Sequence, residues 1–300
     1  MFRQSQRLDG AHSGGIWSIC WRDDIIVSGC IDGSCKLWTA KKNDDNSLHI
    51  KLKTTSSPRN FGITSVLTSN NSDFGVSCSQ DSMIRFFNLE DLSDYDVIDA
   101  GILEAWTVCL SDGDDMLATG THSGALNIWS VAEKTKVCSI ETKGKLILSS
   151  AFSQEGTSIA TTGMDGVLNI IDIINQSIVH RIEAHFMPAR KVVFSSDANL
   201  IFTASDDRHV SVYDVRSGSV INSFSHSGMA LSLDLSPDRK HFIVGASDHT
   251  VSYWDLGMQR CLQKFDSAHS DFIWSVCFDD SGKKMASAGD DGVIQIYEFN

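Results

Sequence analysis

Three stretches of the chain carry a histidine, a serine or threonine, and an aspartate in the same order and at similar spacing. These residue types form the triad of serine hydrolases, in which the histidine activates a hydroxyl and the acid orients the histidine. Three copies argue against catalysis, because an active site needs one, and no Gly-x-Ser-x-Gly turn is present. The alternative is structural: the acid bonds the histidine, the histidine bonds the hydroxyl, and the hydroxyl reaches an aromatic residue. The sets are His12, Ser28, Asp32 and Trp38; His185, Thr203, Asp207 and Tyr213; and His269, Ser287, Asp291 and Tyr297.

The other residue types that could do chemistry show no site pattern. None of the eight cysteines has Cys-x-x-Cys spacing, so we expect no zinc site but thiols that act as small apolar side chains in a reducing compartment. Neither of the common glycine-rich phosphate loops occurs. We therefore expect no catalytic residue, no metal and no cofactor. The cysteines are Cys20, Cys30, Cys35, Cys78, Cys109, Cys138, Cys261 and Cys277.

The elements that carry these residues repeat seven times along the 300-residue chain. Each unit ends a strand at an aromatic residue or isoleucine, at intervals of 41 to 49 residues, and six of the seven carry an aspartate six residues earlier. This period, with Trp254-Asp255 ending one strand, is the signature of a WD-repeat β-propeller. We predict an all-β, seven-bladed propeller forming a single domain over residues 1–300. The strand ends are Trp38, Phe87, Trp129, Ile171, Tyr213, Trp254 and Tyr297.

Two segments depart from the repeat. The last unit stops after its third strand, so we predict that residues 2–8 supply its fourth strand and close the ring. The first unit has extra polar residues from Thr39 to Ser47, which we interpret as an exposed loop between its third and fourth strands.

We expect a partner-binding surface on the face of the propeller where each innermost strand begins and where the turn between the second and third strands lies. Three tryptophans share one position on the first strand, which suits a binding hot spot, although packing near the channel is the alternative. The acids among the residues before the turn aspartates could pair with a partner's arginine or could be solvated surface acids. The predicted partner-binding residues are Trp17, Trp106, Trp274, His122, Met164, Arg190, Asp206 and Asp290.

Composition limits the partners. The chain is 42% hydrophobic and 21% charged, as in globular proteins, and its formal net charge is −13. That charge disfavours direct nucleic-acid binding, which needs a basic surface. No apolar run is long enough for a bilayer, and the N-terminus lacks the apolar stretch of a signal peptide. We expect an intracellular protein that is a monomer when isolated.

Several ordered runs resemble one branch of the WD-repeat family, the small WD-repeat subunit shared by the superkiller (Ski) complex and the polymerase-associated-factor complex. The resemblance covers essentially the whole chain, with departures in residues 39–47 and 154–156. The runs are Asp99-Ala100-Gly101, Glu104-Ala105-Trp106-Thr107, Leu117-Ala118-Thr119-Gly120-Thr121-His122, Gly144-Lys145-Leu146-Ile147-Leu148-Ser149, Ala184-His185-Phe186-Met187-Pro188 and Phe202-Thr203-Ala204-Ser205-Asp206-Asp207.

The resemblance implies a non-catalytic scaffold in the nucleus and the cytoplasm. In the superkiller complex such a subunit binds a tetratricopeptide-repeat protein and helps assemble a helicase for exosome-mediated mRNA decay. In the polymerase-associated-factor complex it supports transcription elongation and histone modification. Family members bind Arg-containing motifs on the top face. The alternatives are another WD-repeat adaptor, such as a ubiquitin-ligase substrate receptor or a histone-tail reader, and an enzyme built on a propeller.

Overall fold

The computed structural model describes residues 1–42, 48–57, 59–71 and 73–299. Its strands form seven four-stranded antiparallel sheets, and the fold is a seven-bladed β-propeller, as the repeat predicts. The chain divides into two compact units: Met1–Gln80, Ile84–Val97 and Asp234–Asn300 make the first unit, and Asp81–Met83 and Ile98–Leu233 make the second. The expectation of a single domain over residues 1–300 stays a prediction.

The first unit contains two complete sheets. They consist of β2 (Ile16–Arg22), β3 (Ile25–Cys30), β4 (Cys35–Lys42) and β5 (Leu48–Thr55), and of β26 (Ile273–Phe278), β27 (Lys284–Gly289), β28 (Ile294–Phe299) and β1 (Phe2–Leu8).

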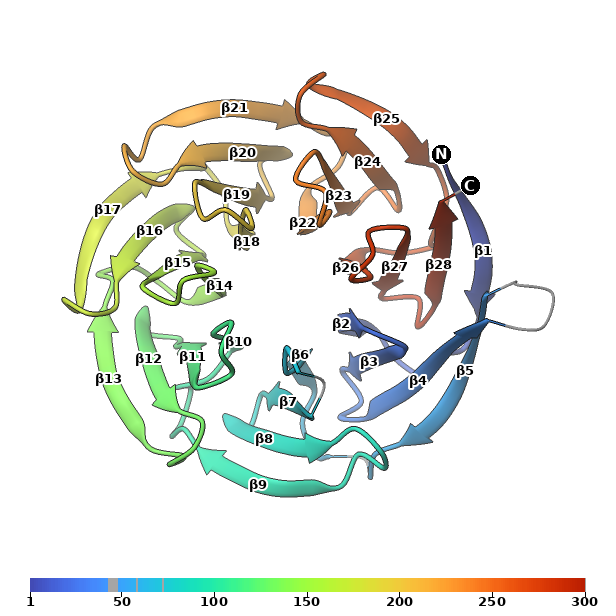
Figure 1. Cartoon of the computed structure of the whole chain (residues 1–300), viewed down its shortest axis with the longest axis horizontal. Helices are drawn as coiled ribbons and strands as arrows, with labels where there is room; N and C mark the ends of the chain where they lie inside the picture. The colour runs from blue at the N-terminus through green and yellow to red at the C-terminus, as the bar shows by residue number, and fades with distance from the viewer. Residues whose placement is uncertain (43–47, 58, 72, 300) are drawn as a thin grey trace. The chain divides into compact units, whose positions relative to one another are not determined.

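The second unit contains three complete sheets, which follow one another in Figure 1. They are β10 (Thr107–Leu110), β11 (Met116–Gly120), β12 (Ala125–Ser130) and β13 (Lys136–Glu141); β14 (Ile147–Phe152), β15 (Ser158–Gly163), β16 (Val167–Asp172) and β17 (Ser177–Glu183); and β18 (Ala189–Phe194), β19 (Leu200–Ser205), β20 (His209–Asp214) and β21 (Val220–Ser225).

Two sheets remain. They are β6 (Ile63–Thr68), β7 (Phe74–Ser79), β8 (Met83–Asn88) and β9 (Asp94–Asp99), and β22 (Ala230–Leu235), β23 (His241–Ala246), β24 (Val251–Asp255) and β25 (Arg260–Phe265). We number the blades 1 to 7 by their innermost strands β2, β6, β10, β14, β18, β22 and β26. Among the described residues there is no helix that could cross a bilayer.

The second strand of each blade is built from small and apolar residues because it is buried on both faces. In β3 every residue after Ile25 is buried, and β27 shows the same pattern. Gly29 shows how tightly the next blade packs: a Cβ placed there would lie 2.6 Å from Ile63 Cγ2 and 2.8 Å from Val66 Cγ1. The outermost strands differ, because β17 alternates between exposed and half-buried residues. The small residues of the second strands and the polar residues of β17 therefore follow from the burial of each strand.

The fourth strand of blade 7 comes from the N-terminus, as predicted. Strand β1 pairs antiparallel with β28 from Phe2↔Phe299 to Leu8↔Ile294, with a register shift between Gln4 and Gln6 (Figure 1). The Phe2 side chain is 3% exposed and packs edge-on against Tyr253, with the ring centroids 5.0 Å apart. The pairing covers the edge that β28 would otherwise expose.

The expected loop from Thr39 to Ser47 begins later than predicted. Thr39 and Ala40 continue strand β4, which runs to Lys42 and pairs with β5 through Lys42↔Leu48. The strand extends because Ala40 is 1% exposed and packs in the core of the blade, which the polar appearance of the segment concealed. Residues 43–47 of the expected loop lie outside the described residues.

Candidate functional site

Blade 7 contains the hydrogen-bonded chain that the sequence predicts. His269 Nδ1 lies 2.9 Å from Asp291 Oδ1, and His269 Nε2 lies 2.8 Å from Ser287 Oγ. Ser287 Oγ in turn lies 3.2 Å from the Tyr297 hydroxyl. Burial pushes the pKa of Asp291 up, but the bonds from His269 and from the Ser270 amide outweigh it, so the pKa is lowered. The carboxylate therefore stays ionised as the acceptor at the end of the chain.

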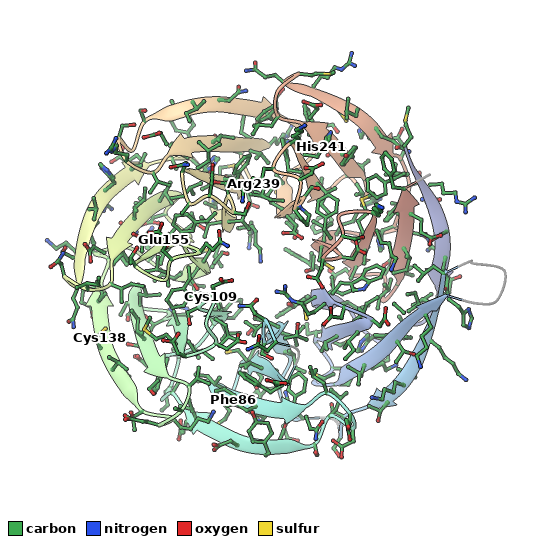
Figure 2. All side chains as sticks on the ribbon, in the orientation of Figure 1. Phe86, Cys109, Cys138, Glu155, Arg239 and His241 are labelled. Atoms are coloured by element: carbon green, nitrogen blue, oxygen red, sulfur yellow. The ribbon has the colours of Figure 1, made fainter. Side chains whose placement is uncertain are left out.

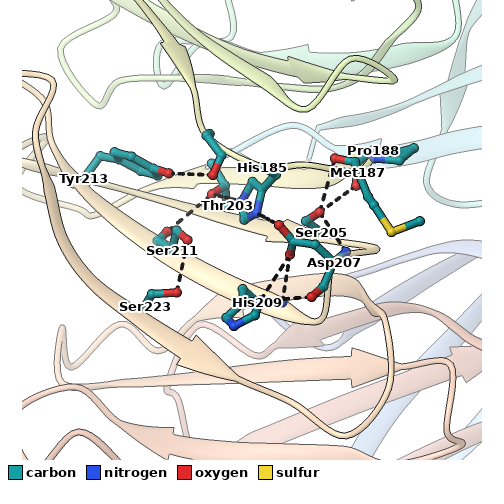
Figure 3. Close-up of polar contacts among 11 residues, drawn as sticks. His185, Met187, Pro188, Thr203, Ser205, Asp207, His209, Ser211, Tyr213 and Ser223 are labelled. Atoms are coloured by element: carbon teal, nitrogen blue, oxygen red, sulfur yellow. Dashed lines mark hydrogen bonds and ion pairs between the residues drawn. The ribbon is translucent and has the colours of Figure 1, made fainter.

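Blade 5 forms the first two links of the same chain (Figure 3). His185 Nδ1 lies 2.7 Å from Asp207 Oδ2, and Nε2 lies 2.7 Å from Thr203 Oγ1. The predicted third link is wrong here, because the Tyr213 hydroxyl donates to the Ala184 carbonyl, 3.1 Å away. The Tyr213 hydroxyl thus finds its acceptor in the loop before β18, whereas the Tyr297 hydroxyl of blade 7 meets the serine.

Blade 1 changes the first link. His12 Nε2 lies 2.7 Å from Ser28 Oγ, which also accepts from Trp38 Nε1 at 2.9 Å. His12 Nδ1, however, meets Ser34 Oγ at 3.1 Å, and it is Ser34 that donates to Asp32 at 2.6 Å. The predicted direct bond between His12 and Asp32 is thus replaced by a bond through a serine.

Two of the buried histidines, His12 and His185, have lowered pKa values, which favour the neutral imidazole. Burial, followed by the charge of Lys36, lowers the pKa of His12 to about 4. Burial also lowers the pKa of His185, although Asp207 opposes the shift. The hydroxyls of Ser28, Thr203 and Ser287 lie on residues that are 0% exposed, where no substrate can reach them. These groups therefore satisfy buried polar atoms, and their geometry fits the structural interpretation.

Two further blades satisfy the same position without histidine, which the sequence reasoning missed. In blade 2, Arg59 Nη1 donates to Ser77 Oγ at 2.7 Å, and Nη2 donates to Asp94 at 2.9 Å. In blade 3, Trp129 Nε1 donates to Thr119 Oγ1 at 3.0 Å. The available signal was a long polar residue a few positions before the innermost strand, where other blades carry histidine.

The predicted partner-binding residues lie at one end of their blades. In blades 3, 4, 5 and 7 the amide of the residue before the turn aspartate, or its equivalent, donates to a carbonyl in the loop before the innermost strand: His122 N to Leu103 O (2.9 Å), Met164 N to Leu146 O (3.0 Å), Asp206 N to Pro188 O (3.0 Å) and Asp290 N to Phe272 O (2.9 Å). We call these paired loops and turns the top loops.

In the first unit the top loops bring Trp17, Trp274 and Asp290 to neighbouring blades. Trp17 lies on β2 and Trp274 on β26, two strands linked by the bond from the Ile19 amide to Ser275 Oγ at 3.1 Å. Both indoles are half-buried. Gly15 leaves space for the Asp290 carboxylate, since any side chain at that position would collide with it.

In the second unit the structure places the other five predicted residues on blades 3, 4 and 5. Trp106 is half-buried, whereas His122 and Met164 are exposed. The Arg190 guanidinium forms an ion pair with the Asp206 carboxylate, in which Nε donates to Oδ1 at 2.9 Å and Nη2 donates to Oδ2 at 2.7 Å. Asp206 is 6% exposed, so this carboxylate is already engaged by an arginine of the same chain.

Burial keeps four of the cysteine thiols protonated at neutral pH. Burial raises the pKa of Cys20 and Cys30 to about 11 and that of Cys35 and Cys109 to about 12. Figure 2 shows Cys109 and Cys138 at opposite edges of one sheet, on β10 and β13. Thiolates are the reactive form, so these cysteines are inert at neutral pH.

The four apolar side chains Ile102, Leu103, Phe186 and Met187 were also missed. They lie in the top loops and are exposed by 92%, 56%, 102% and 48%. The available signal was two pairs of apolar residues shortly before the innermost strands β10 and β18.

Comparison with known proteins matches five segments of this chain to one family of repeats. The family described as "WD domain, G-beta repeat" matches residues 3–39, 50–88, 176–214, 218–255 and 259–298. WD repeat-containing protein SL1-17 of Schistosoma mansoni is 30% identical over 156 residues, 50% of this chain and 50% of that protein. WD repeat-containing protein VIP3 of Arabidopsis thaliana is 28% identical over 177 residues, 52% of this chain and 53% of that protein.

A shorter match is to the DDB1- and CUL4-associated factor 11 homolog of Caenorhabditis briggsae, 33% identical over 64 residues, 21% of this chain and 12% of that protein. The chain thus spans about half the length of SL1-17 and VIP3 and less of the third relative.

Proposed function

The chain belongs to the WD domain, G-beta repeat family, and we propose that it is a non-catalytic scaffold that binds other proteins through its top loops. WD40 propellers generally bind protein partners. The observation that carries the proposal is the set of apolar side chains exposed in the top loops of the second unit.

Five apolar residues of these loops are well exposed. Phe186 is 102% exposed, Ile102 92%, Leu103 56%, Met187 48% and Met164 42%. They come from three successive blades, and each lies before an innermost strand or in the turn between the second and third strands. Large exposed apolar side chains gathered in loops are typical of a protein-binding surface, and an aromatic side chain is a common anchor.

Charge suits the protein to a partner with basic residues. The net charge of −13 attracts cationic segments at long range. Within the top loops of the first unit, Asp290 is exposed beside Trp17 and Trp274, whereas Asp206 is occupied by Arg190. Of these two acids, we assign the contact with a partner's arginine to Asp290.

For the partners we propose the complexes that the ordered sequence runs suggest. The chain is then the WD-repeat subunit of the superkiller complex, which binds a tetratricopeptide-repeat scaffold and a helicase in the cytoplasm. It also serves the polymerase-associated-factor complex in the nucleus. The support is the combination from Asp99-Ala100-Gly101 to Phe202-Thr203-Ala204-Ser205-Asp206-Asp207, which covers three blades.

The test is affinity purification of the tagged full chain from cytoplasmic and nuclear fractions, followed by mass spectrometry. We expect a tetratricopeptide-repeat protein and a helicase in the first fraction and polymerase-associated subunits in the second. The double variant Ile102→Ser and Phe186→Ser should lose them. The matched control is Val179→Ser with Ile221→Ser, two residues exposed by 54% and 57% on outer strands. Equal recovery from both variants would disprove binding through the top loops.

A second candidate is an adaptor of the ubiquitin-ligase type. It is favoured by the match to a protein named for its association with DDB1 and CUL4, although that match covers 21% of this chain. The same purification separates the two, because this candidate requires DDB1 and CUL4 among the recovered proteins. Recovery of histones instead would indicate a histone-tail reader.

A further inference from the structure

A histidine, a cysteine and an aspartate meet at the top of blade 1. One donor atom each of His12, Cys30 and Asp32 lies within 4.8 Å of the other two. His12 lies in the loop between β1 and β2, Cys30 ends β3, and Asp32 lies in the turn that follows. The pairing Ile16↔Cys30 between β2 and β3 holds the loop beside the turn. We infer that these three side chains form a binding site for Zn²⁺.

The donor set suits this ion. Zn²⁺ binds imidazole nitrogen, thiolate sulfur and carboxylate oxygen, and sites with three protein ligands keep a fourth position for water or another ligand. A thiolate and a carboxylate together supply two negative charges against the two positive charges of the ion. His12 is 4% exposed and Cys30 0%, whereas Asp32 is exposed and gives the ion a path from solvent.

The surroundings of His12 match those of a metal-binding imidazole. Such a histidine holds its second ring nitrogen in a hydrogen bond, which fixes the ring. Here Nε2 lies 2.7 Å from Ser28 Oγ, and Nδ1 lies 3.1 Å from Ser34 Oγ, which donates to Asp32. An ion at Nδ1 would take the place of the Ser34 hydroxyl, which now joins the ring to Asp32. On binding, the Cys30 thiol releases its proton to solvent and the imidazole proton moves from Nδ1 to Nε2, so that the Ser28 hydroxyl changes from donor to acceptor in its bond with His12.

Blade 1 differs from the other two histidine-containing blades in the contact between histidine and aspartate and in the residue two positions before that aspartate. His185 and His269 contact their aspartates directly, at 2.7 Å and 2.9 Å, which leaves no space for an ion between them. The residue that corresponds to Cys30, two before the turn acid, is Ser205 in blade 5 and Gly289 in blade 7. The soft ligand and the wider gap therefore occur together in blade 1.

One neighbouring charge opposes the ion. Lys36 Nζ donates to the carbonyl of Ala11, the residue before His12, at 2.6 Å. Its positive charge raises the electrostatic potential at the site, so Lys36→Met should strengthen Zn²⁺ binding. An adventitious contact at an exposed aspartate elsewhere on the chain would not respond to this change.

The experiment is a titration of the reduced, chelator-treated full chain with Co²⁺, followed by displacement with Zn²⁺. We expect a near-ultraviolet band from thiolate-to-Co²⁺ charge transfer that disappears as Zn²⁺ is added. Cys30→Ser should abolish the band, and it should still fold because blade 5 carries serine at the same position. Cys78→Ser is the control, since Cys78 is likewise 0% exposed but lies on β7, and it should keep the band.

Two further measurements complete the test. Asp32→Asn should weaken Zn²⁺ binding by about tenfold or more, because even residues that only support metal ligands have effects of that size. Zn²⁺ should also raise the thermal midpoint of the wild-type chain, because an ion that binds the folded state stabilises it, and should leave the midpoint of Cys30→Ser unchanged. The inference is overturned if wild-type protein shows no band at saturating Co²⁺, if the band persists in Cys30→Ser, or if Zn²⁺ leaves the thermal midpoint of the wild-type chain unchanged.

Discussion

Replacing Phe2 with alanine should strongly destabilise the first unit. Phe2 is the first residue of β1 and is 3% exposed. Its ring packs against Tyr253 with centroids 5.0 Å apart and an interplanar angle of 71°, and against Phe299 at 5.2 Å and 79°. It belongs to a core cluster that also contains Ile273 and Tyr297. One side chain thus fastens the closing strand to the core of blade 7.

The expected cost follows from these contacts. Burying a phenylalanine side chain stabilises a protein by about 1.5–3 kcal/mol. Each edge-to-face aromatic pair adds about 0.5–1.5 kcal/mol beyond its buried area. With the cavity left behind, Phe2→Ala should lower the free energy of unfolding by about 3–5 kcal/mol, the range for buried phenylalanines. Phe299 is 50% exposed, so Phe299→Ala should cost about half of that or less.

Urea denaturation followed by tryptophan fluorescence measures both variants. Amide hydrogen exchange shows where the structure is destabilised. A loosened β1 leaves the outer edge of β28 unpaired, so the amides of β28 should exchange faster. Deletion of residues 1–9 should exceed Phe2→Ala in both measurements. If Phe2→Ala were no more destabilising than Phe299→Ala, the closing strand would not be held by its apolar anchor and the reasoning would fail.

Three further outcomes are expected. Asp291→Ala should lower the free energy of unfolding by about 1–3 kcal/mol, because it leaves the buried His269 without its hydrogen-bond acceptor. The urea midpoint measures this effect, and Asp290→Ala, at an exposed residue, should leave the midpoint nearly unchanged. The free energy of unfolding should fall as the pH drops below 6.5, because burial lowers the pKa of His185 in the folded state and the unfolded chain then binds one more proton. His185→Gln should show a shallower dependence of the unfolding free energy on pH between pH 7 and pH 5. An unchanged slope would contradict the lowered pKa of His185. Gly29→Ala should cost about 1–3 kcal/mol by overpacking against Ile63, as thermal denaturation would show, and a neutral effect would mean that the blades separate easily.

The sequence predicted the features that depend on local pattern. Strand alternation and turn residues recur in every unit, so the seven blades and the strand from Phe2 to Leu8 could be placed without coordinates. The hydrogen-bonded chain in blade 7 was predictable for the same reason, since its four members sit at fixed positions of the repeat.

Features that depend on where a side chain points were not predictable. Nothing in the sequence indicates that Ser34 comes between His12 and Asp32, or that Arg190 turns onto Asp206 and not toward solvent. Both depend on loop geometry that neighbouring strands impose. The exposure of Phe186 was missed for a related reason: an apolar residue beside a strand is usually buried, and only the path of the loop turns it outward.

The pairing of β1 with β28 has a consequence for synthesis on the ribosome. The partner of Phe2 is Phe299, so β1 cannot join its sheet until β28, almost 300 residues later in the chain, has emerged from the ribosome. At about 5–20 residues per second, this nascent segment waits for tens of seconds, and its apolar Phe2 side chain stays accessible to chaperones for that time. Blade 7 is therefore completed only after the other six blades have been translated, and a chain that lacks β28 leaves β1 with an unpaired edge that quality control can recognise.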